Sequence, residues 1–387
     1  MPFAFTLPTT SSLSFSTFAT TIAGRGPPRV KGKGLDYEIV FILHTLACVY
    51  TLQARAQLLA LYASTTPTDE QRIAIITTAT KYLIQANSVH AYLASRSAET
   101  DASSTVVETL SQTQGGLAAL ALAEATLLAV LKDDPYPAVV AQERNKNDKD
   151  WMIKPPEIPK VRAHLFARLC LGAAEHAGKS EAMLSASGRV DEALMKYVSD
   201  LKKTARAKAC RMFGIHAEIE GETGQGIAWL VGAKKQLGFA ANDEGAKIKG
   251  LAKIKKDWTE RKEDRKVEKG GEWGSDAGRL EELRVIEMLE QKWNNLNDTI
   301  NTQLVPPSDP LVAGIPSGRN IYTTKPFISP TLDEDTLARM RAPPDREGMA
   351  NDGGDSSSDD GDKTQQNSLP GAFPGSSVAP SNEDSYY

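Results

Sequence analysis

Histidine and cysteine, the side chains that most often bind metals or act as nucleophiles, are few and scattered in this chain. A zinc site needs three or four such ligands at close spacing, because they must converge on one ion. His164 and His176 are too far apart to pair on one helix face, and we find no cysteine with a second ligand at metal-binding spacing. The sequence therefore predicts no metal site and no cofactor. The cysteines, Cys48, Cys170 and Cys210, are interpreted as small buried residues in a reducing compartment.

The residue groupings that catalysis requires are also missing from the sequence. Gly221, Gly224 and Gly226 lack the lysine and the preceding strand of a phosphate-binding loop, and no Gly-x-Ser-x-Gly elbow occurs. Glu124 interrupts an apolar stretch. Such a carboxyl group is either catalytic with a raised pKa, or a buried polar residue paired across helices, or part of an exposed edge, and the last two are favoured. We therefore predict no catalytic residues and a protein that is not an enzyme.

The residues discussed above lie on or between segments that are predicted to form long helices. Two helix-period patterns fill residues 35–96, separated by a short joint around Pro67, and they predict an antiparallel helical hairpin. In the joint, Thr68 is a candidate N-cap, followed by Asp69 and Glu70 in the first turn. The apolar run at residues 39–50 indicates a buried helix core and is too short to span a bilayer. The second pattern carries one stripe with steps of three and four: Ile76, Ala79, Leu83, Ala86, His90 and Leu93.

Further helical patterns follow at residues 108–132, 161–188, 190–219, 227–237 and 286–300. Gly115 and Gly116 lie inside the first of these, which suggests close packing or a kink. The pattern at 286–300, formed by Ile286, Leu289, Trp293, Leu296 and Ile300, is expected to return to the core. Residues 304–330 are rich in proline but contain enough Ile, Tyr and Phe to pack as an extended segment along the helices. No second copy of any unit occurs at fixed period, so a regular repeat array is not expected.

Charge is distributed unevenly along the chain. The net charge is −4, yet residues 343–387 alone carry nine acidic and two basic side chains. This tail is too polar to offset its chain entropy and is predicted to be disordered. Residues 247–269 hold ten basic and five acidic side chains, which indicates a solvated helix face or loop, or alternatively a surface for acidic lipid or an acidic partner. Nucleic-acid binding is not favoured, because Trp258 is the only aromatic residue there.

Several stretches, taken in order, resemble the Bro domain, the helical domain of endosomal adaptor proteins, and within that family the fungal ambient-pH regulators. The quoted stretches are Met1-Pro2-Phe3-Ala4-Phe5-Thr6-Leu7-Pro8, Gly34-Leu35-Asp36-Tyr37-Glu38-Ile39, His90-Ala91-Tyr92-Leu93, Leu120-Ala121-Leu122-Ala123-Glu124, Ala207-Lys208-Ala209-Cys210, Ile227-Ala228-Trp229-Leu230 and Asn320-Ile321-Tyr322. The chain departs from the family at residues 20–25, where a segment of early helices and short strands is missing. The resemblance covers most of residues 1–330.

The resemblance implies an all-α fold, an elongated solenoid of helical hairpins of tetratricopeptide-like form, with an extended segment and a disordered acidic tail. The implied domains are a Bro-type domain at residues 1–330 and the tail at 331–387. The implied function is that of a non-catalytic adaptor of the fungal Pal/Rim pathway, which recruits ESCRT-III to a pH-sensor complex and promotes proteolytic activation of the transcription factor PacC. Implied partners are the C-terminal helix of an ESCRT-III filament subunit and other Pal proteins. The protein would be cytoplasmic and recruited through partners to the plasma membrane or endosomes.

By the same resemblance, the third helix lines the groove that receives the partner helix, a recognition mode that relies on a few apolar anchors. The candidate partner-binding residues are Leu110, Leu117 and Leu120. All three could equally be core residues. The alternative function is that of an unrelated helical protein that uses residues 247–269 to bind nucleic acid or acidic lipid.

Overall fold

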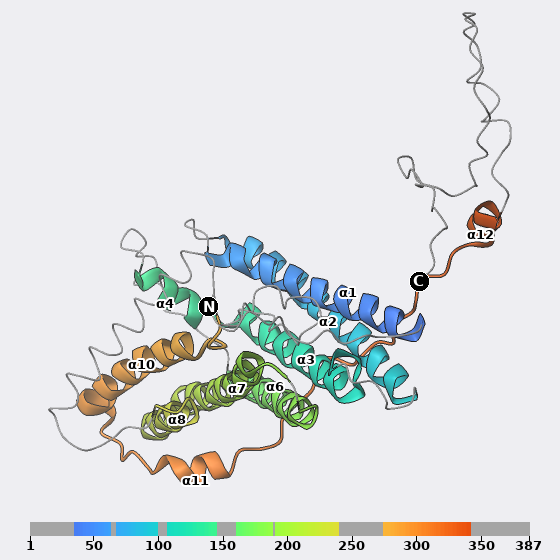
Figure 1. Ribbon diagram of the computed structural model, residues 1–387. Coiled ribbons are helices and arrows are strands. Elements are labelled where there is room, and N and C mark those ends of the chain that lie inside the picture. The colour runs from blue at the N-terminus through green and yellow to red at the C-terminus, as the bar shows by residue number, and fades with distance from the viewer. Residues whose placement is uncertain are drawn as a thin grey trace, which may run out of the picture. The chain divides into compact units, whose positions relative to one another are not determined.

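The computed structural model describes residues 35–62, 67–99, 107–144, 160–188, 190–239 and 274–341. Within these ranges every regular element is helical, which confirms the predicted all-α fold (Figure 1). The chain divides into two compact units, Met1–Ile328 and Ser329–Tyr387, which we describe separately. Residues 247–269 and 342–387, the predicted basic stretch and most of the acidic tail, lie outside the described ranges.

The first unit contains a row of helices that pack side by side in chain order. Its members are α1 (Leu35–Leu59), α2 (Asp69–Glu99), α3 (Ser111–Asp133), α6 (Lys160–Ala186), α7 (Glu192–Ile219) and α8 (Thr223–Gln236). Each helix makes extensive contact with the next one along the chain. The short helix α4 (Tyr136–Arg144) follows α3, and α10 (Arg279–Leu296) packs against α4, α7 and α8. The main hydrophobic core therefore runs through the row.

The α1–α2 hairpin confirms the prediction from periodicity and capping. Thr68 and Gln71 form a capping box: the Gln71 N–H donates to Thr68 Oγ1 at 3.3 Å, and the Thr68 N–H donates to Gln71 Oε1 at 3.1 Å. Both orphan N–H groups at the start of α2 thereby gain partners. All six residues of the predicted α2 stripe, from Ile76 to Leu93, are buried. The stripe faces α1 and α3, the two neighbours of α2 in the row.

The glycine pair in α3 allows close approach of α6, as the sequence suggested. A Cβ atom on Gly116 would lie 2.8 Å from Leu184 Cγ, and one on Gly115 would overlap the end of Met183. Because neither space can hold a larger side chain without displacement, the two helices pack backbone to side chain at this point. The cost of glycine in a helix, about 1 kcal/mol each relative to alanine, is offset by this packing.

The end of α10 differs from its prediction. A π-helical turn, η3 (Asn297–Asn301), continues α10, and the Thr302 N–H donates to the Asn297 carbonyl at 2.7 Å, five residues back. A π turn adds one residue and so rotates the following side chains. Asn297, the first residue of this turn, is buried, whereas Ile300, within the turn, is 71% exposed. The predicted return of this helix to the core is therefore confirmed for Ile286, Leu289 and Trp293, which are buried, and wrong for Ile300. The sequence period assumed an uninterrupted α-helix.

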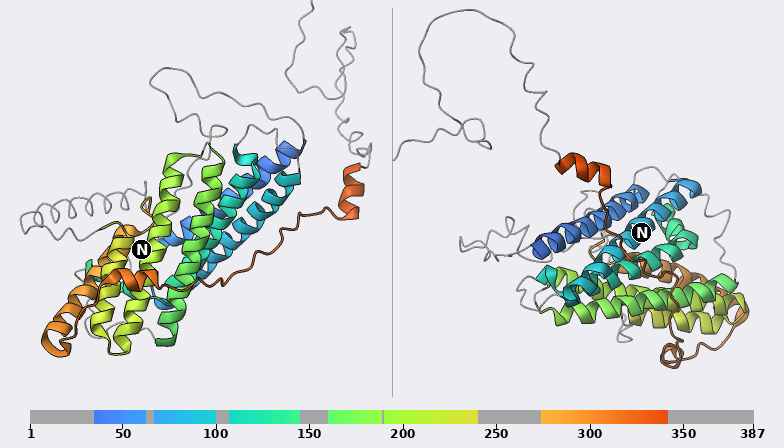
Figure 2. Two further views of the ribbon diagram at one scale, coloured as in Figure 1. Left: turned by 90° about the horizontal axis from the view of Figure 1, so that it is seen from below. Right: turned by 90° about the vertical axis from the view of Figure 1, so that its right-hand side faces the viewer.

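An extended strap, residues 303–328, runs back along the helices and confirms the predicted segment. It contains one short helix, α11 (Ser308–Ala313), which packs on α8, and then passes α6 toward α2 (Figure 2). The Arg319 N–H donates to the Arg168 carbonyl at 2.9 Å, and the Gly318 N–H donates to Glu175 Oε1 at 2.7 Å. A Cβ on Gly172 would collide with the carbonyl of Arg319, so this glycine allows the strap to lie directly on α6.

The strap ends on α2. The Phe327 ring lies 5.5 Å from that of Tyr92, and the Ser88 hydroxyl donates to the carbonyl of Lys325. The second unit begins just beyond, and it contains a helix, α12 (Glu334–Arg341). Asp333 caps α12 by accepting from the Thr336 N–H at 2.7 Å. The predicted disordered region, residues 331–387, therefore includes a capped helix at 334–341.

The outer side of α1 corrects another expectation. Residues 39–50 were predicted to form a buried helix core, yet α1 is buried on one side only. In length and composition α1 and α3 could each cross a membrane, but 78% of the apolar window of α3 is buried and only 22% of that of α1. α3 is thus a core helix. α1 lies at the edge of the row (Figure 1). Its large apolar side chains Ile42, Val49, Leu52 and Leu59 are exposed.

Candidate functional site

The three residues predicted to bind a partner helix lie along α3, but they differ in exposure. Leu110 occupies the N-cap position of α3, has extended backbone angles, and is partly exposed. Leu117, two turns further on, is partly buried against the main core. Leu120 is a member of that core and is 8% exposed. The outer edges of Leu110 and Leu117 are therefore accessible to a partner, whereas Leu120 serves chiefly to pack the helices.

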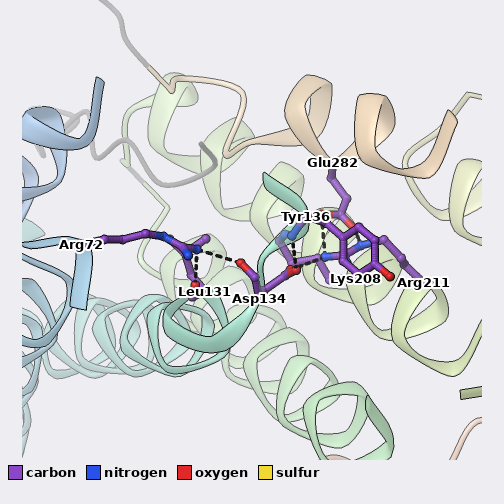
Figure 3. A network of polar contacts seen from close by, with 7 residues as sticks. All are labelled: Arg72, Leu131, Asp134, Tyr136, Lys208, Arg211 and Glu282. Carbon is purple, nitrogen blue, oxygen red and sulfur yellow. Dashed lines mark hydrogen bonds and ion pairs between the residues drawn. The ribbon is translucent and has the colours of Figure 1, made fainter. Parts of the chain in front are cut away.

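A buried network of charged side chains links four parts of the fold (Figure 3). Arg211 of α7 donates through Nε to Glu282 Oε1 of α10 and through Nη2 to Asp134 Oδ2 of the α3–α4 junction, both at 2.6 Å. Lys208, one turn earlier on α7, donates to the other oxygen of Glu282. The exposed fraction is 0% for the Arg211 side chain and 1% for that of Asp134. Charges this deeply buried are stable only as a mutually paired set.

The pKa shifts in the network follow from its geometry. Burial alone would lower the pKa of Arg211, but Asp134 and Glu282 raise it above its ordinary value, so the guanidinium stays charged. Burial likewise tends to raise the pKa of Asp134, yet Arg211 and Lys208 hold it below the usual range. Arg211 and Asp134 therefore each depend on their partners to remain charged in a low-dielectric interior.

Residues of the network also form hydrogen bonds with the backbone at the C-terminal end of α3 and at the N-terminal end of α4. Arg72 of α2 donates through Nη2 to the carbonyls of Leu131 and Asp134 at 2.8 and 2.7 Å, and these groups lie at the C-terminal end of α3. Asp134 Oδ1 accepts from the Tyr136 N–H at 3.1 Å and so caps α4. The Arg211 guanidinium carbon lies 5.7 Å from the centre of the Tyr136 ring. Tyr136 is thus held inside the fold through both its backbone N–H and its ring.

Glu124 is the buried polar residue paired across helices that one reading of the sequence favoured. It is 1% exposed, and the Tyr197 hydroxyl of α7 donates to its Oε1 at 2.9 Å. Burial raises the pKa of Glu124 well above its ordinary value, and the Tyr197 hydrogen bond offsets only part of this shift. Because its pKa is higher in the folded than in the unfolded chain, Glu124 favours folding at low pH and opposes it progressively as pH rises.

A second buried polar cluster joins α1, α2 and α3 through two histidines. Gln114 of α3 lies between them, with Oε1 2.7 Å from His90 Nδ1 and Nε2 3.0 Å from His44 Nδ1. His44 Nε2 lies 3.6 Å from the Sγ atom of Cys48 on the next turn of α1. The interpretation of Cys48 as isolated was therefore wrong, because a spacing of four residues places it beside His44 on one helix face. In the described part of the chain, no group of three metal-binding side chains comes together.

Burial lowers the pKa of His44 to about 4 and that of His90 to about 3, and the hydrogen bonds that each histidine forms with Gln114 offset only part of the effect. Burial also raises the pKa of the Cys48 thiol to about 11. At neutral pH the imidazoles are uncharged and the thiol is protonated. The cluster consequently has the chemistry of a helix-packing element, since it offers neither a thiolate nucleophile nor an imidazole that changes charge near pH 7.

Sequence reasoning missed the charged network, although one signal was present. Lys208 and Arg211 continue a three-and-four rhythm on α7 that also contains Leu194, Tyr197, Leu201, Thr204 and Ile215, all of them buried. Charged residues at positions of a buried stripe predict internal ion pairs. Their partners could not be named in this way, because Asp134 and Glu282 lie more than 70 residues away in either direction.

The sequence comparisons place the chain in a family. No protein-family model matches it. It is 48% identical over 379 positions to the pH-response regulator protein palC of Emericella nidulans, a match that covers 90% of this chain and 74% of the relative. The chain belongs to the palC family. It is also 33% identical over 148 residues to palC of Cryptococcus neoformans var. neoformans serotype D, covering 37% of this chain and 28% of that protein.

Comparison with solved structures agrees with the family in fold. A structure of the ALIX BRO1 domain in complex with CHMP4C has a TM-score of 0.50 at 17% identity and covers 79% of this chain and 68% of its own. A crystal structure of ALIX in complex with the SIVmac239 PYKEVTEDL late domain gives the same score and identity, with 35% of that chain covered. The chain thus matches about a third of ALIX. These likenesses confirm a Bro-type helical fold for this palC-family protein.

The palC family also fits the predicted class of protein. Its named members are regulators, which agrees with the prediction of a non-catalytic adaptor. The alternative of an unrelated helical protein is not supported, because the relationship covers nine-tenths of the chain. The alignment with the Emericella protein is 379 positions long, which is more than the 90% of this 387-residue chain that it covers. The Emericella protein therefore has residues within the aligned region that have no counterpart in this chain.

Proposed function

We propose that this chain is a non-catalytic adaptor of the fungal ambient-pH signalling pathway, which binds the C-terminal helix of an ESCRT-III filament subunit. The observation that carries the proposal is the 48% identity to a pH-response regulator over 90% of the chain. The Bro-type row of helices supports it, because an ALIX BRO1 domain of this fold has been solved with CHMP4C. In this role the chain recruits ESCRT-III to the pH-sensor complex and promotes proteolytic activation of PacC.

The proposed contact surface is the accessible edge of α3 at Leu110 and Leu117. Both side chains are apolar and partly exposed, seven residues apart, and so lie on one face across two helical turns. An amphipathic helix that places apolar residues at similar spacing can cover both. The protein would be cytoplasmic and reach the plasma membrane or endosomes through its partners, including other Pal proteins.

A pull-down with the C-terminal helix of the ESCRT-III subunit tests the proposal. The variants are Leu117→Asp and Leu110→Asp, and the second is the sharper, because aspartate at an N-cap position supplies the side-chain cap that Leu110 lacks. Leu110→Asp should therefore leave the helix folded while placing a charge on the contact surface. Ile219→Asp, at a distant exposed apolar position, is the matched control.

We expect wild type and Ile219→Asp to bind the helix and both α3 variants to lose at least about tenfold in affinity. Binding should persist as salt is raised, since an apolar contact does not depend on counterion release. Equal binding by wild type and the folded Leu110→Asp variant would reject the surface. Failure of the folded wild type to bind would reject the function.

A further inference from the structure

The exposed face of α1 carries a regular apolar stripe that the described part of the fold does not cover. Its positions alternate by three and four residues, and all six are exposed: Ile42, Thr45, Val49, Leu52, Ala56 and Leu59. The exposed fraction is 62% for Ile42, 42% for Val49, 45% for Leu52 and 41% for Leu59. The opposite face, including Ala47, Ala54 and Leu58, is packed into the fold. α1 is therefore apolar on two sides and buried on one.

Such a face is unusual at the end of a helical row. Terminal elements of stacked helical structures normally carry a polar outer surface, because nothing further covers them. Between Glu38 and Arg55, however, the outer face of α1 has no charged side chain. A contiguous apolar stripe of this kind indicates that another segment packs on it.

We propose that the chain's own N-terminal segment, residues 1–24, docks along this face of α1. The segment has no charged side chain, which matches the uncharged stripe, and it contains four of the ten phenylalanines of the chain. Its large apolar residues after Met1 are Phe3, Phe5, Leu7, Leu13, Phe15, Phe18 and Ile22. Burial of these rings against the stripe would favour docking of the segment.

The covalent connection makes this occupant favourable. Residues 25–34 join the segment to the first residue of α1 and can span up to ~33 Å, which approaches the ~37 Å length of the 25-residue helix. The segment can therefore turn back and run along the stripe. A short tether also keeps it at an effective concentration on the order of millimolar.

Two other occupants fit less well. A second copy of the chain would pair through six side chains, two of them the small Thr45 and Ala56, whereas stable dimers use about 20–30 residues on each side. A membrane-surface helix normally carries several Lys or Arg residues on its polar face. α1 has one, Arg55, and its other face is occupied by α2.

Photo-crosslinking in the full chain tests the proposal. Benzoylphenylalanine is introduced at Val49, within the stripe, and in a control at Ile219, which is an apolar β-branched residue with the same 42% exposure on α7. We expect the Val49 probe to crosslink within one chain to residues 1–24, as mapped by peptide mass spectrometry, and the Ile219 probe not to do so. A product of twice the chain mass, capture only of added phosphatidylserine-containing vesicles, or no product with residues 1–24 would each overturn the proposal.

A pair of matched variants establishes whether the aromatic side chains hold the segment. Phe15→Asp with Phe18→Asp removes two apolar groups, and Ser14→Asp with Ser16→Asp adds the same charge at polar positions. The first pair should reduce the Val49 crosslink by about tenfold or more, because each buried ring contributes on the order of tenfold to docking. The second pair should leave most of the crosslink intact. Equal loss in both pairs would mean that charge alone, and not apolar docking, disrupts the contact.

Discussion

Replacement of Arg211 by methionine should strongly destabilise the fold. Arg211 forms ion pairs with both Asp134 and Glu282, and its own side chain is 0% exposed. Methionine has a similar length but removes the ion pair of Asp134. The Asp134 carboxylate then keeps the hydrogen bond from the Tyr136 N–H and the longer-range attraction of Lys208, whereas Glu282 keeps its ion pair with Lys208. Loss of one partner from a buried ion pair costs about 3–5 kcal/mol. That is a large part of the roughly 5–15 kcal/mol by which a typical domain is stable.

The loss of stability caused by Arg211→Met should also depend on pH, and the pKa of Asp134 determines the direction of that dependence. In the wild type the pKa of Asp134 lies below its ordinary value, so its contribution to stability is present above that value and is lost as pH falls. Without Arg211, burial dominates and raises the pKa of Asp134, so the variant loses stability as pH rises. The gap between the two proteins should therefore be wider at pH 7 than at pH 5.

Urea unfolding followed by helical circular dichroism at both pH values measures this gap. Arg162→Met is the matched control, because Arg162 pairs with the adjacent Asp133 at 3.8 Å but both side chains are largely exposed. Exposed pairs contribute about 0–1 kcal/mol. The reasoning would be refuted if Arg211→Met cost no more than Arg162→Met, or if the gap widened on acidification.

Three further predictions concern buried groups and the strap. Glu124→Gln keeps an acceptor for Tyr197 but removes the charge, so it should stabilise the protein at pH 8 in urea unfolding, by about 1.4 kcal/mol for each unit of raised pKa. Acidification from pH 6.5 to about 4 should cost roughly 3 kcal/mol through His44 alone, since its pKa falls from 6.5 unfolded to about 4 folded. Gly172→Ala should lift the strap from α6 and speed tryptic cleavage after Arg319 about tenfold.

Each of these has a contrasting outcome. Gly178→Ala, on the same helix, is the control, because the added Cβ would meet only Lys202 at 3.8 Å. Its rate of cleavage after Arg319 should match that of the wild type. If Gly172→Ala were also cleaved at the wild-type rate, the contact between the strap and α6 would be contradicted. Lower stability of Glu124→Gln at pH 8 would show that the carboxylate is favourable. An imidazole resonance of His44 that titrates near pH 6.5 would mean that the ring is exposed in solution.

Local features of the fold could be predicted because their causes lie within a few residues. The α2 stripe follows from the period of the helix, and the capping box at Thr68 needs only Gln71 three residues on. For Gly116 the sequence left two possibilities open, close packing or a kink. It shows that this position has no side chain, but not which residue occupies the free space. Leu184 supplies that answer from 68 residues away.

Features that depend on distant partners could not be predicted in the same way. Periodicity shows which residues of α1 are apolar, but not that the other described helices cover only one of its two apolar faces. The exposure of Ile300 depends on one π turn, which the residue spacing in α10 does not predict. Of the candidate site, Leu110 and Leu117 could be placed on a helix from sequence, whereas their accessible edges depend on the arrangement of the neighbouring helices.

A family of pH-response regulators suggests that a histidine within the chain senses pH, and the buried pair argues against that role. A sensor near neutrality needs an imidazole whose charged form is stabilised by solvent or a carboxylate. His44 and His90 are bridged by the neutral Gln114 side chain and have pKa values of about 4 and 3, so both remain uncharged from pH 5.5 to 8. Affinity for the ESCRT-III helix should therefore differ by less than about twofold between these pH values, by fluorescence anisotropy. A large change with a midpoint near 6.5, abolished by His44→Gln in a folded variant, would show instead that the pair carries the pH signal.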